Sequence, residues 1–113
     1  MHPDDIYLAS FPFGDAPGMK LRPVLLLTDR LGSVPEVVVA YISSVIPAVL
    51  LPTDLVIDPV NPDGASTNLK TKSVLRLHKL ATIHASAIVR RLGAISAKTS
   101  TEVDGKLRAL FQL

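Results

Sequence analysis

Short runs of apolar residues, many of them β-branched, alternate along the chain with clusters of turn-forming residues. Several short runs at this spacing are typical of a small all-β barrel or sandwich. The predicted strands cover residues 5–13, 22–28, 35–46, 53–58, 73–77 and 92–95. Residues 14–18 and 59–68 are rich in proline, glycine, asparagine and aspartate, so they are expected to form loops.

The C-terminal residues have the one clear helical pattern in the chain. Ser96 is a candidate N-cap, and apolar residues follow at helical spacing, namely Val103, Leu107, Leu110 and Phe111. Gly105 weakens this helix by about 1 kcal/mol relative to alanine. A further helical turn is expected within residues 84–91. The pattern therefore predicts a mainly-β (α+β) fold: five or six antiparallel strands in a small SH3-like or OB-like barrel, with a C-terminal α-helix.

Composition narrows the class of protein. The 113 residues fit one domain, expected to cover residues 1–113, and the 48% hydrophobic content argues against disorder. The absence of cysteine excludes disulfides, thiolate zinc sites and a cysteine nucleophile, and it fits the cytoplasm. The N-terminus does not resemble a signal peptide, and Glu36 and Pro47 interrupt the apolar residues 34–51, so no membrane span is expected.

Several kinds of functional site are missing from the sequence. Gly14 and Gly18 lack the lysine-serine continuation of a phosphate-binding loop. The three histidines, His2, His78 and His84, have poor spacing for one metal ion, so neither a metal nor a cofactor is expected. The net charge of +2 permits a nucleic-acid partner without requiring one.

Three sets of polar residues lie beside apolar strands. Arg22 precedes Pro23, which suits a strand start; it is either a solvated strand end or a phosphate clamp. Ser43 and Ser44 end an apolar run, as a simple turn or as hydroxyl donors at the mouth of a barrel. The third set is Arg76 with His78.

Arg76 and His78 lie two residues apart on the fifth predicted strand. Alternation places Val74 and Arg76 on one face of that strand, and Leu75 and Leu77 on the other. An arginine beside an imidazole suits metal-free RNA cleavage, which needs a proton acceptor for the ribose 2′-hydroxyl and cations for the charge on phosphorus. The alternative is an exposed strand face with ordinary polar residues.

Six segments occur in a recognisable order: 5–7 with Phe11-Pro12, 20–25, 42–44, 69–74, 82–83 and 91–93, before the terminal helix. Together they resemble the PemK/MazF family of type II toxin–antitoxin endoribonucleases over essentially the whole chain. The resemblance implies an SH3-like barrel that forms a homodimer and cuts single-stranded RNA at short sequences. It also implies 2′,3′-cyclic phosphate and 5′-hydroxyl products, no metal, and inhibition by a cognate antitoxin.

The resemblance assigns roles to individual positions. Arg22 matches the arginine that stabilises the scissile phosphate, and Ser43 matches a hydroxyl donor. Arg76 matches the arginine of an Arg-x-Asp pair and is expected to act as acid or electrostatic clamp. His78 replaces the aspartate of that pair, so the carboxylate beside Arg76 is expected to be lost and His78 is the candidate base.

Five further residues are expected to bind RNA: Lys20, Ser44, Lys70, Lys72 and Ser73. The loop 14–19, which sets sequence preference in the family, is short here and has no arginine. Because His78 replaces the carboxylate, a non-catalytic protein- or nucleic-acid-binding module remains the second hypothesis. The related gyrase-poison fold is a third.

Overall fold

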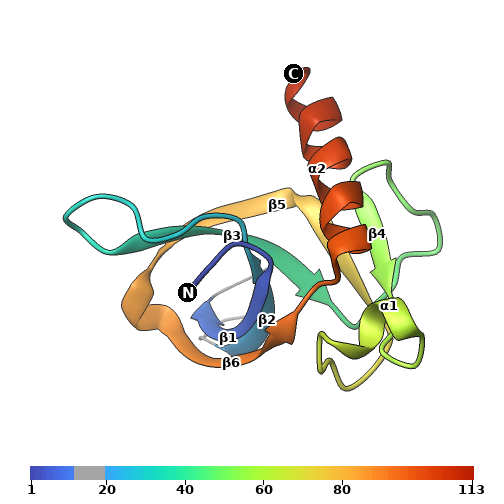
Figure 1. Ribbon diagram of the computed structural model, residues 1–113, viewed down its shortest axis with the longest axis horizontal. Helices are drawn as coiled ribbons and strands as arrows, with labels where there is room; N and C mark the ends of the chain where they lie inside the picture. The colour runs from blue at the N-terminus through green and yellow to red at the C-terminus, as the bar shows by residue number, and fades with distance from the viewer. Residues whose placement is uncertain (12–19) are drawn as a thin grey trace.

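The computed structural model of the protein describes residues 1–11 and 20–113. Six strands form one antiparallel sheet in the order β4-β5-β3-β2-β1-β6, and a long C-terminal helix leaves its edge (Figure 1). The elements are β1 (Asp5–Phe11), β2 (Lys20–Leu26), β3 (Glu36–Ser43), β4 (Asp54–Ile57), α1 (Pro62–Ala65), β5 (Ser73–His84), the 3₁₀ turn η1 (Ala85–Ala87), β6 (Ile88–Ala94) and α2 (Ala97–Phe111). The predicted mainly-β class with a C-terminal helix is confirmed.

The sheet curls strongly but does not close by strand pairing. In the described part of the chain, β4 and β6 remain edge strands. The segment after α1 covers the edge of β6: the Ala94 N–H donates to the Ser66 carbonyl at 3.0 Å, and the Asn68 amide donates to the Leu92 carbonyl at 2.8 Å. The connection between β4 and β5 therefore protects the edge that a closed barrel would have paired.

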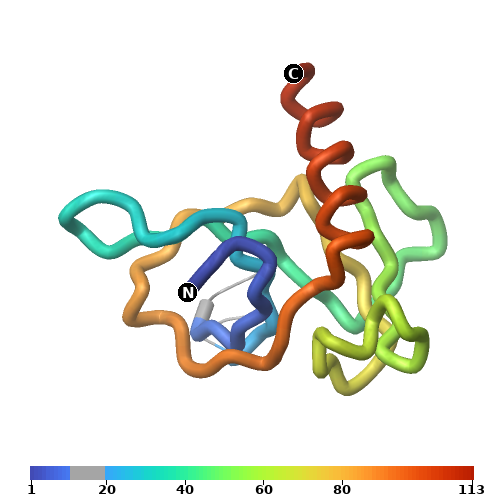
Figure 2. The backbone as a smooth tube through the Cα atoms, in the orientation of Figure 1, coloured from blue at the N-terminus to red at the C-terminus, as the bar shows by residue number. Residues whose placement is uncertain are grey.

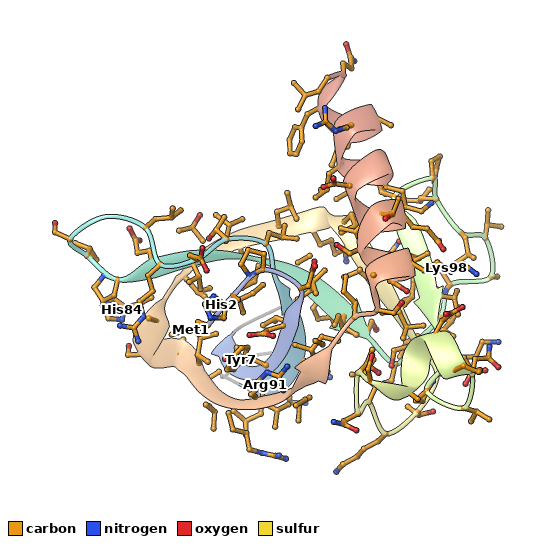
Figure 3. All side chains as sticks on the ribbon, viewed as in Figure 1. Met1, His2, Tyr7, His84, Arg91 and Lys98 are labelled. Carbon is orange, nitrogen blue, oxygen red and sulfur yellow. The ribbon has the colours of Figure 1, made fainter. Side chains whose placement is uncertain are left out.

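Each face of the sheet carries an apolar cluster. The larger one lies between the sheet and α2 and includes Ile6, Leu25, Ile42, Leu75, Leu77 and Val103. The second fills the inside of the curl and includes Ala9, Val24, Leu26, Val37, Val39 and Ile83. Met1 and Tyr7 pack against this second cluster, as the side chains in Figure 3 show. Two clusters explain why β2 is apolar on both faces.

The C-terminal helix begins as predicted. The Ser96 hydroxyl accepts a hydrogen bond from the Thr99 N–H at 3.1 Å, and Val103 is buried in the larger cluster. The last turns extend away from the sheet, which leaves Phe111 57% exposed (Figure 2). Neither helix in the described residues is long and apolar enough to cross a membrane.

Two strand boundaries differ from those predicted for reasons that local contacts explain. The second strand starts at Lys20, so Pro23 lies inside it; there β2 pairs with β1 alone, which a proline without an N–H tolerates. The third strand ends at Ser43, because the Ser43 hydroxyl accepts from the Val45 N–H and forms a turn. Residues 12 and 13 of the first predicted strand, and the loop 14–19, lie outside the described residues.

The last two strands were predicted too short. The fifth strand continues to His84, because its second half pairs with β3 through Leu80 to His84 although polar residues break the apolar alternation. The helical turn predicted within residues 84–91 is confined to residues 85–87, and β6 begins at Ile88 instead of residue 92. The expected loop 59–68 contains the short helix α1.

Gly93 lies where β6 meets the segment after α1. A Cβ on Gly93 would overlap the carbonyl groups of Ser66 and Thr67, whereas a Cβ on Gly105 would meet open space. We expect Gly93→Ala to lower the free energy of unfolding by about 1–3 kcal/mol, because the backbone must shift. Gly105→Ala, the matched control on α2, is expected to raise it by about 1 kcal/mol. Chemical denaturation of the two variants checks both signs, and an unchanged Gly93→Ala midpoint would contradict the close approach.

Candidate active site

The predicted catalytic residues on β2, β3 and β5 lie on one face of the sheet. Cross-strand pairing aligns Val24, Tyr41 and Arg76 in one row. Side chains two residues apart along a strand share a face. Arg22 therefore lies on the face of Val24, and Ser43 on the face of Tyr41. This is the concave face that carries the second apolar cluster.

The spacing of the strands brings the two arginines within reach of one ligand. Arg22 and Arg76 are two strands apart, and Arg22 is displaced by two residues along the strand direction. Strands lie about 4.8 Å apart and rise about 3.3 Å per residue, so the two Cα atoms are about 12 Å apart on this lattice. Two long side chains at that separation can contact neighbouring groups of one RNA strand.

Arg76 is held by a carboxylate from the neighbouring strand. Its Nε donates to Oδ1 of Asp54 at 2.9 Å, and its Nη2 donates to Oδ2 at 3.3 Å. The Asp54 side chain has no exposed surface, and that of Arg76 is 19% exposed. A two-bond arginine–carboxylate pair of this kind fixes the plane of the guanidinium.

This pair corrects the expectation that the carboxylate beside Arg76 is lost. Asp54 supplies it from β4, directly across the strand pair from Arg76. Sequence reasoning missed Asp54 because its partner lies 22 positions further along the chain. The signal was present, since Asp54 is a lone acid at the start of the apolar run Leu55–Ile57.

His78 belongs to the same group of side chains. Its Nδ1 lies 2.8 Å from Oγ1 of Thr53, within hydrogen-bond distance, and 4.0 Å from Oδ1 of Asp54. The His78 side chain is 27% exposed. Thr53, Asp54, Arg76 and His78 therefore form one polar cluster, in which the acid is buried and the two basic side chains remain accessible.

Burial raises the pKa of Asp54, but its hydrogen bonds and neighbouring charges outweigh that effect. The guanidinium of Arg76, the backbone N–H of Leu51 and the charge of His78 together hold this pKa below its usual value of 3.8. Asp54 is thus ionised at neutral pH despite its burial. In the described residues, every buried side-chain nitrogen or oxygen has a hydrogen-bond partner.

Ser43 uses its hydroxyl within its own turn. Its Oγ accepts from the Val45 N–H at 3.1 Å, and the hydroxyl proton is directed to the Val45 carbonyl over a longer 3.4 Å. A bond of 3.4 Å is weak for a hydroxyl donor. The proton of Ser43 is consequently available to a stronger acceptor such as a phosphate oxygen.

Several of the predicted RNA-binding residues line a cleft of about 420 Å³. Its polar and charged lining includes Arg22, Ser44, Lys70, Ser73 and Arg90, and none of the described residues that line it is acidic. Leu8, Pro23, Ile42, Leu69 and Leu92 supply the apolar walls. Arg90 was not predicted from the sequence, where it is one of two adjacent arginines without a distinguishing pattern. The cleft combines positive charge with apolar surface, which suits phosphate and base contacts.

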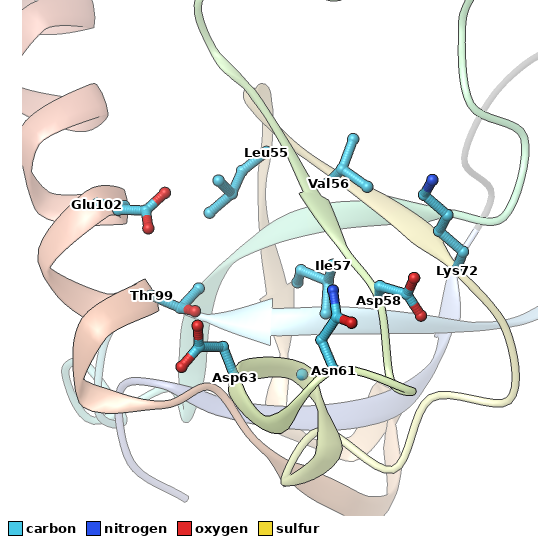
Figure 4. Close-up of a pocket in the computed structure, with 10 residues that line it drawn as sticks. Leu55, Val56, Ile57, Asp58, Asn61, Asp63, Lys72, Thr99 and Glu102 are labelled. Carbon is cyan, nitrogen blue, oxygen red and sulfur yellow. The ribbon is translucent and has the colours of Figure 1, made fainter.

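The two remaining predicted residues lie elsewhere. Lys20 is exposed at the start of β2. Lys72 lines a separate pocket between β4, α1 and α2, together with the acids Asp58, Asp63 and Glu102 (Figure 4). Because three carboxylates surround that pocket, its potential is unfavourable for a phosphate. Within the described residues, no group of three metal-ligating side chains is present.

Comparisons with known proteins agree with the fold. The profile of the PemK-like, MazF-like toxins of type II toxin–antitoxin systems matches residues 2–111. Mycobacterium tuberculosis toxin MazF-mt6 superposes with a TM-score of 0.74 at 24% identity, over 96% of this chain and 97% of that chain. A mycobacterial endoribonuclease, solved in complex with its cognate antitoxin, gives 0.74 at 15% identity, over 100% and 96% of the two chains.

A search of curated proteins found no match. The structural neighbours are too distant in sequence to show more than a shared fold, but the family profile covers nearly the whole chain. The chain therefore belongs to the family of PemK-like, MazF-like toxins of type II toxin–antitoxin systems.

Proposed function

We propose that this protein is an endoribonuclease toxin that cuts single-stranded RNA at selected sequences without a metal ion. It leaves 2′,3′-cyclic phosphate and 5′-hydroxyl ends, and a cognate antitoxin neutralises it. The observation that carries the proposal is that Arg22 and Arg76 share one face of the sheet with His78 beside Arg76. Membership of the toxin family supports it, and so does the cleft at Arg22, whose described lining has three cations and no acid, although Ser43, Arg76 and His78 lie outside that lining.

The reaction needs two proton transfers, both through His78, and stabilisation of the negative charge on the phosphoryl group. His78 takes the proton from the ribose 2′-hydroxyl as the 2′-oxygen forms a bond to phosphorus. The bond from phosphorus to the 5′-oxygen breaks, and the proton returns from the imidazolium to that oxygen. The atoms balance without added water, since the cyclic phosphate and the 5′-hydroxyl together equal the intact strand.

The arginines stabilise the negative charge that develops on the phosphoryl oxygens. The sequence left Arg76 as acid or electrostatic clamp; the pair with Asp54 supports the clamp, because a guanidinium does not give up its proton in a protein. Arg22 acts on the same charge from β2, two strands away from Arg76. Ser43 adds a hydrogen bond to a phosphate oxygen when its proton leaves the Val45 carbonyl.

Cleavage of a long single-stranded RNA in EDTA tests the proposal. We expect discrete cuts at recurring short sequences, and growth arrest when the protein is expressed alone. Co-expression of the cognate antitoxin is expected to restore growth. Absence of cuts in EDTA, with cuts restored by Mg²⁺, would contradict the metal-free mechanism, and absence of cuts under both conditions would contradict the activity.

The cleft predicts which lysine binds RNA more strongly. Lys70 lines the cleft that has no acid among its described residues, whereas Lys72 lies among three carboxylates. We expect Lys70→Ala to weaken RNA binding and to reduce the slope of log K against log salt by about 0.7, the value for one contact to a single strand. Lys72→Ala is the matched control and is expected to change the slope less. Fluorescence anisotropy across a salt series measures both, and equal slopes would contradict this placement of the RNA.

A homodimer remains part of the proposal. Mean hydropathy is +0.37, and the loop between β3 and β4 exposes several apolar residues: Val45, Val49, Leu50 and Leu51. Burial of this surface against a second copy would remove it from water. Sedimentation at micromolar concentration is expected to give a dimer, and a clean monomer would count against it.

The alternative of a non-catalytic binding module rests on His78 in place of an acidic residue. Asp54 restores a carboxylate beside Arg76 from another strand, but its side chain is buried and paired with Arg76. His78 is therefore the proton acceptor on which the two hypotheses differ, and the RNA cleavage assay separates them.

A further inference from the structure

Asp54 lies beneath both basic residues of the proposed cleavage site. Its side chain has no exposed surface, and its two oxygens accept bonds from Arg76 and from the backbone N–H of Leu51. Its backbone is paired with Arg76 across β4 and β5. A carboxylate fixed on this many sides is in place before any ligand binds, so its partners are oriented in advance.

The pair leaves part of the Arg76 guanidinium available. An arginine has five N–H donors, and Asp54 engages two of them. The other donors remain for phosphate oxygens, on a side chain that is 19% exposed. Without Asp54, the guanidinium would rotate among several orientations, and a displacement of this kind is costly for a reaction that depends on geometry.

The same carboxylate lies close to Nδ1 of the His78 ring. Nδ1 of His78 lies 4.0 Å from Oδ1 of Asp54 and 2.8 Å from Oγ1 of Thr53. A negative charge near Nδ1 favours a proton on that nitrogen, which then donates to the Thr53 hydroxyl oxygen. In the neutral ring, the other nitrogen, Nε2, is then without a proton and is the acceptor.

We propose that Asp54 is a positioning residue that fixes the orientation of Arg76 and, together with Thr53, keeps the proton of the neutral His78 ring on Nδ1. The inference rests on the proposed RNA cleavage, in which Nε2 of His78 is the atom that accepts the 2′-hydroxyl proton. Asp54 does not touch the RNA; it acts through Arg76 and His78. Thr53 is the acceptor that completes the arrangement.

Two variants test this inference, each with a matched control. Asp54→Asn keeps the size of the side chain and removes its charge, and Thr53→Val keeps the shape and removes the hydroxyl. Asp104→Asn and Thr101→Val make the same exchanges at exposed positions of α2. For all four, kcat and KM are measured on a short single-stranded RNA. ¹⁵N spectra of the His78 ring near pH 8 report which nitrogen carries the proton.

We expect kcat to fall about 100-fold in Asp54→Asn, with little change in KM, because RNA binding is retained while the reacting groups are misplaced. The ¹⁵N spectra are expected to show an Nδ1–H tautomer in the wild type and in both controls. In Asp54→Asn and Thr53→Val, the Nε2–H tautomer is expected to gain population. Thr53→Val is informative even where Asp54→Asn unfolds, because Thr53 lies outside the buried clusters.

The possible failures are distinguishable. An Nε2–H tautomer in the folded wild type, or full activity in a folded Asp54→Asn variant, would overturn the positioning role while leaving RNA cleavage intact. A wild type that cuts no RNA would overturn the proposed function, and the tautomer measurement would still decide whether Asp54 orients the ring.

Discussion

Arg22→Ala is expected to lower the rate of RNA cleavage by about 10²–10³-fold. The loss follows from removing one preorganised cation from the charge that builds on phosphorus, an effect of this size for a single donor in other enzymes. Arg22 is half-buried and follows the strand's exposed start, so its truncation leaves the buried residues of β2 in place. The measurement is a single-turnover rate on a defined RNA.

Two further variants sharpen the Arg22 prediction. Arg22→Lys keeps the charge but loses the planar fork that matches phosphate oxygens, so an intermediate rate is expected. Arg30→Ala removes an exposed arginine from the loop between β2 and β3 and is expected to cleave normally. Cleavage by Arg22→Ala at the wild-type rate would contradict the assignment of Arg22 to the scissile phosphate.

Arg76→Ala is expected to lower the free energy of unfolding at pH 7 by about 3–5 kcal/mol. This is the usual cost of leaving a buried carboxylate without its partner, and the Asp54 side chain is fully buried. Arg91→Ala, which breaks the more exposed pair between Arg91 and Asp5, is the control. A surface pair of that kind is worth about 0–1 kcal/mol.

The contribution of Asp54 to the free energy of unfolding should change with pH in opposite directions in the wild type and in Arg76→Ala. In the wild type, the folded-state pKa of Asp54 lies below its usual value of 3.8. Its stabilising contribution is therefore present above pH 3.8 and is lost as the pH falls through the folded-state pKa. In Arg76→Ala, burial is expected to raise the pKa of Asp54, so protonation relieves the destabilisation as the pH falls.

The difference in unfolding free energy between wild type and Arg76→Ala should therefore shrink from pH 7 towards pH 3. Urea denaturation at a series of pH values measures it. The double variant Asp54→Leu with Arg76→Ala, which leaves no buried charge, is expected to lack this pH dependence. A difference that stays constant or widens in acid would contradict the role of Arg76 as the partner of an ionised Asp54.

Local pattern was enough to predict the face that Arg76 occupies on its strand and the buried strand that follows Arg22, whereas the alignment of Arg22 with Arg76 on one face came from the pairing of the strands. Strand alternation predicted that Arg76 and Leu75 lie on opposite faces of one strand, and Leu75 is buried in the structure. The apolar run after Arg22 predicted a buried strand, and residues 24–26 of β2 are buried. The N-cap at Ser96 also followed from residue type alone. These features depend on residues within a few positions of one another, where the geometry of a strand or a helix is fixed.

The features that sequence reasoning missed depend on pairing between distant segments. Asp54 meets Arg76 because β4 is in register with β5, and this register is set by the whole sheet. Strand β5 is longer than predicted because β3 supplies hydrogen bonds along residues whose polarity broke the pattern. Lys70 and Lys72 are close in sequence, yet the chain places them in different pockets.

The chemistry of the RNA ends tests the central claim most directly. After incubation in EDTA, mass spectrometry of the fragments is predicted to find a 2′,3′-cyclic phosphate on each upstream fragment and a 5′-hydroxyl on each downstream one. These ends follow only if the ribose 2′-oxygen attacks phosphorus, which is the step that the proposed roles of His78 and the two arginines serve. Fragments with 3′-hydroxyl and 5′-phosphate ends would contradict the account.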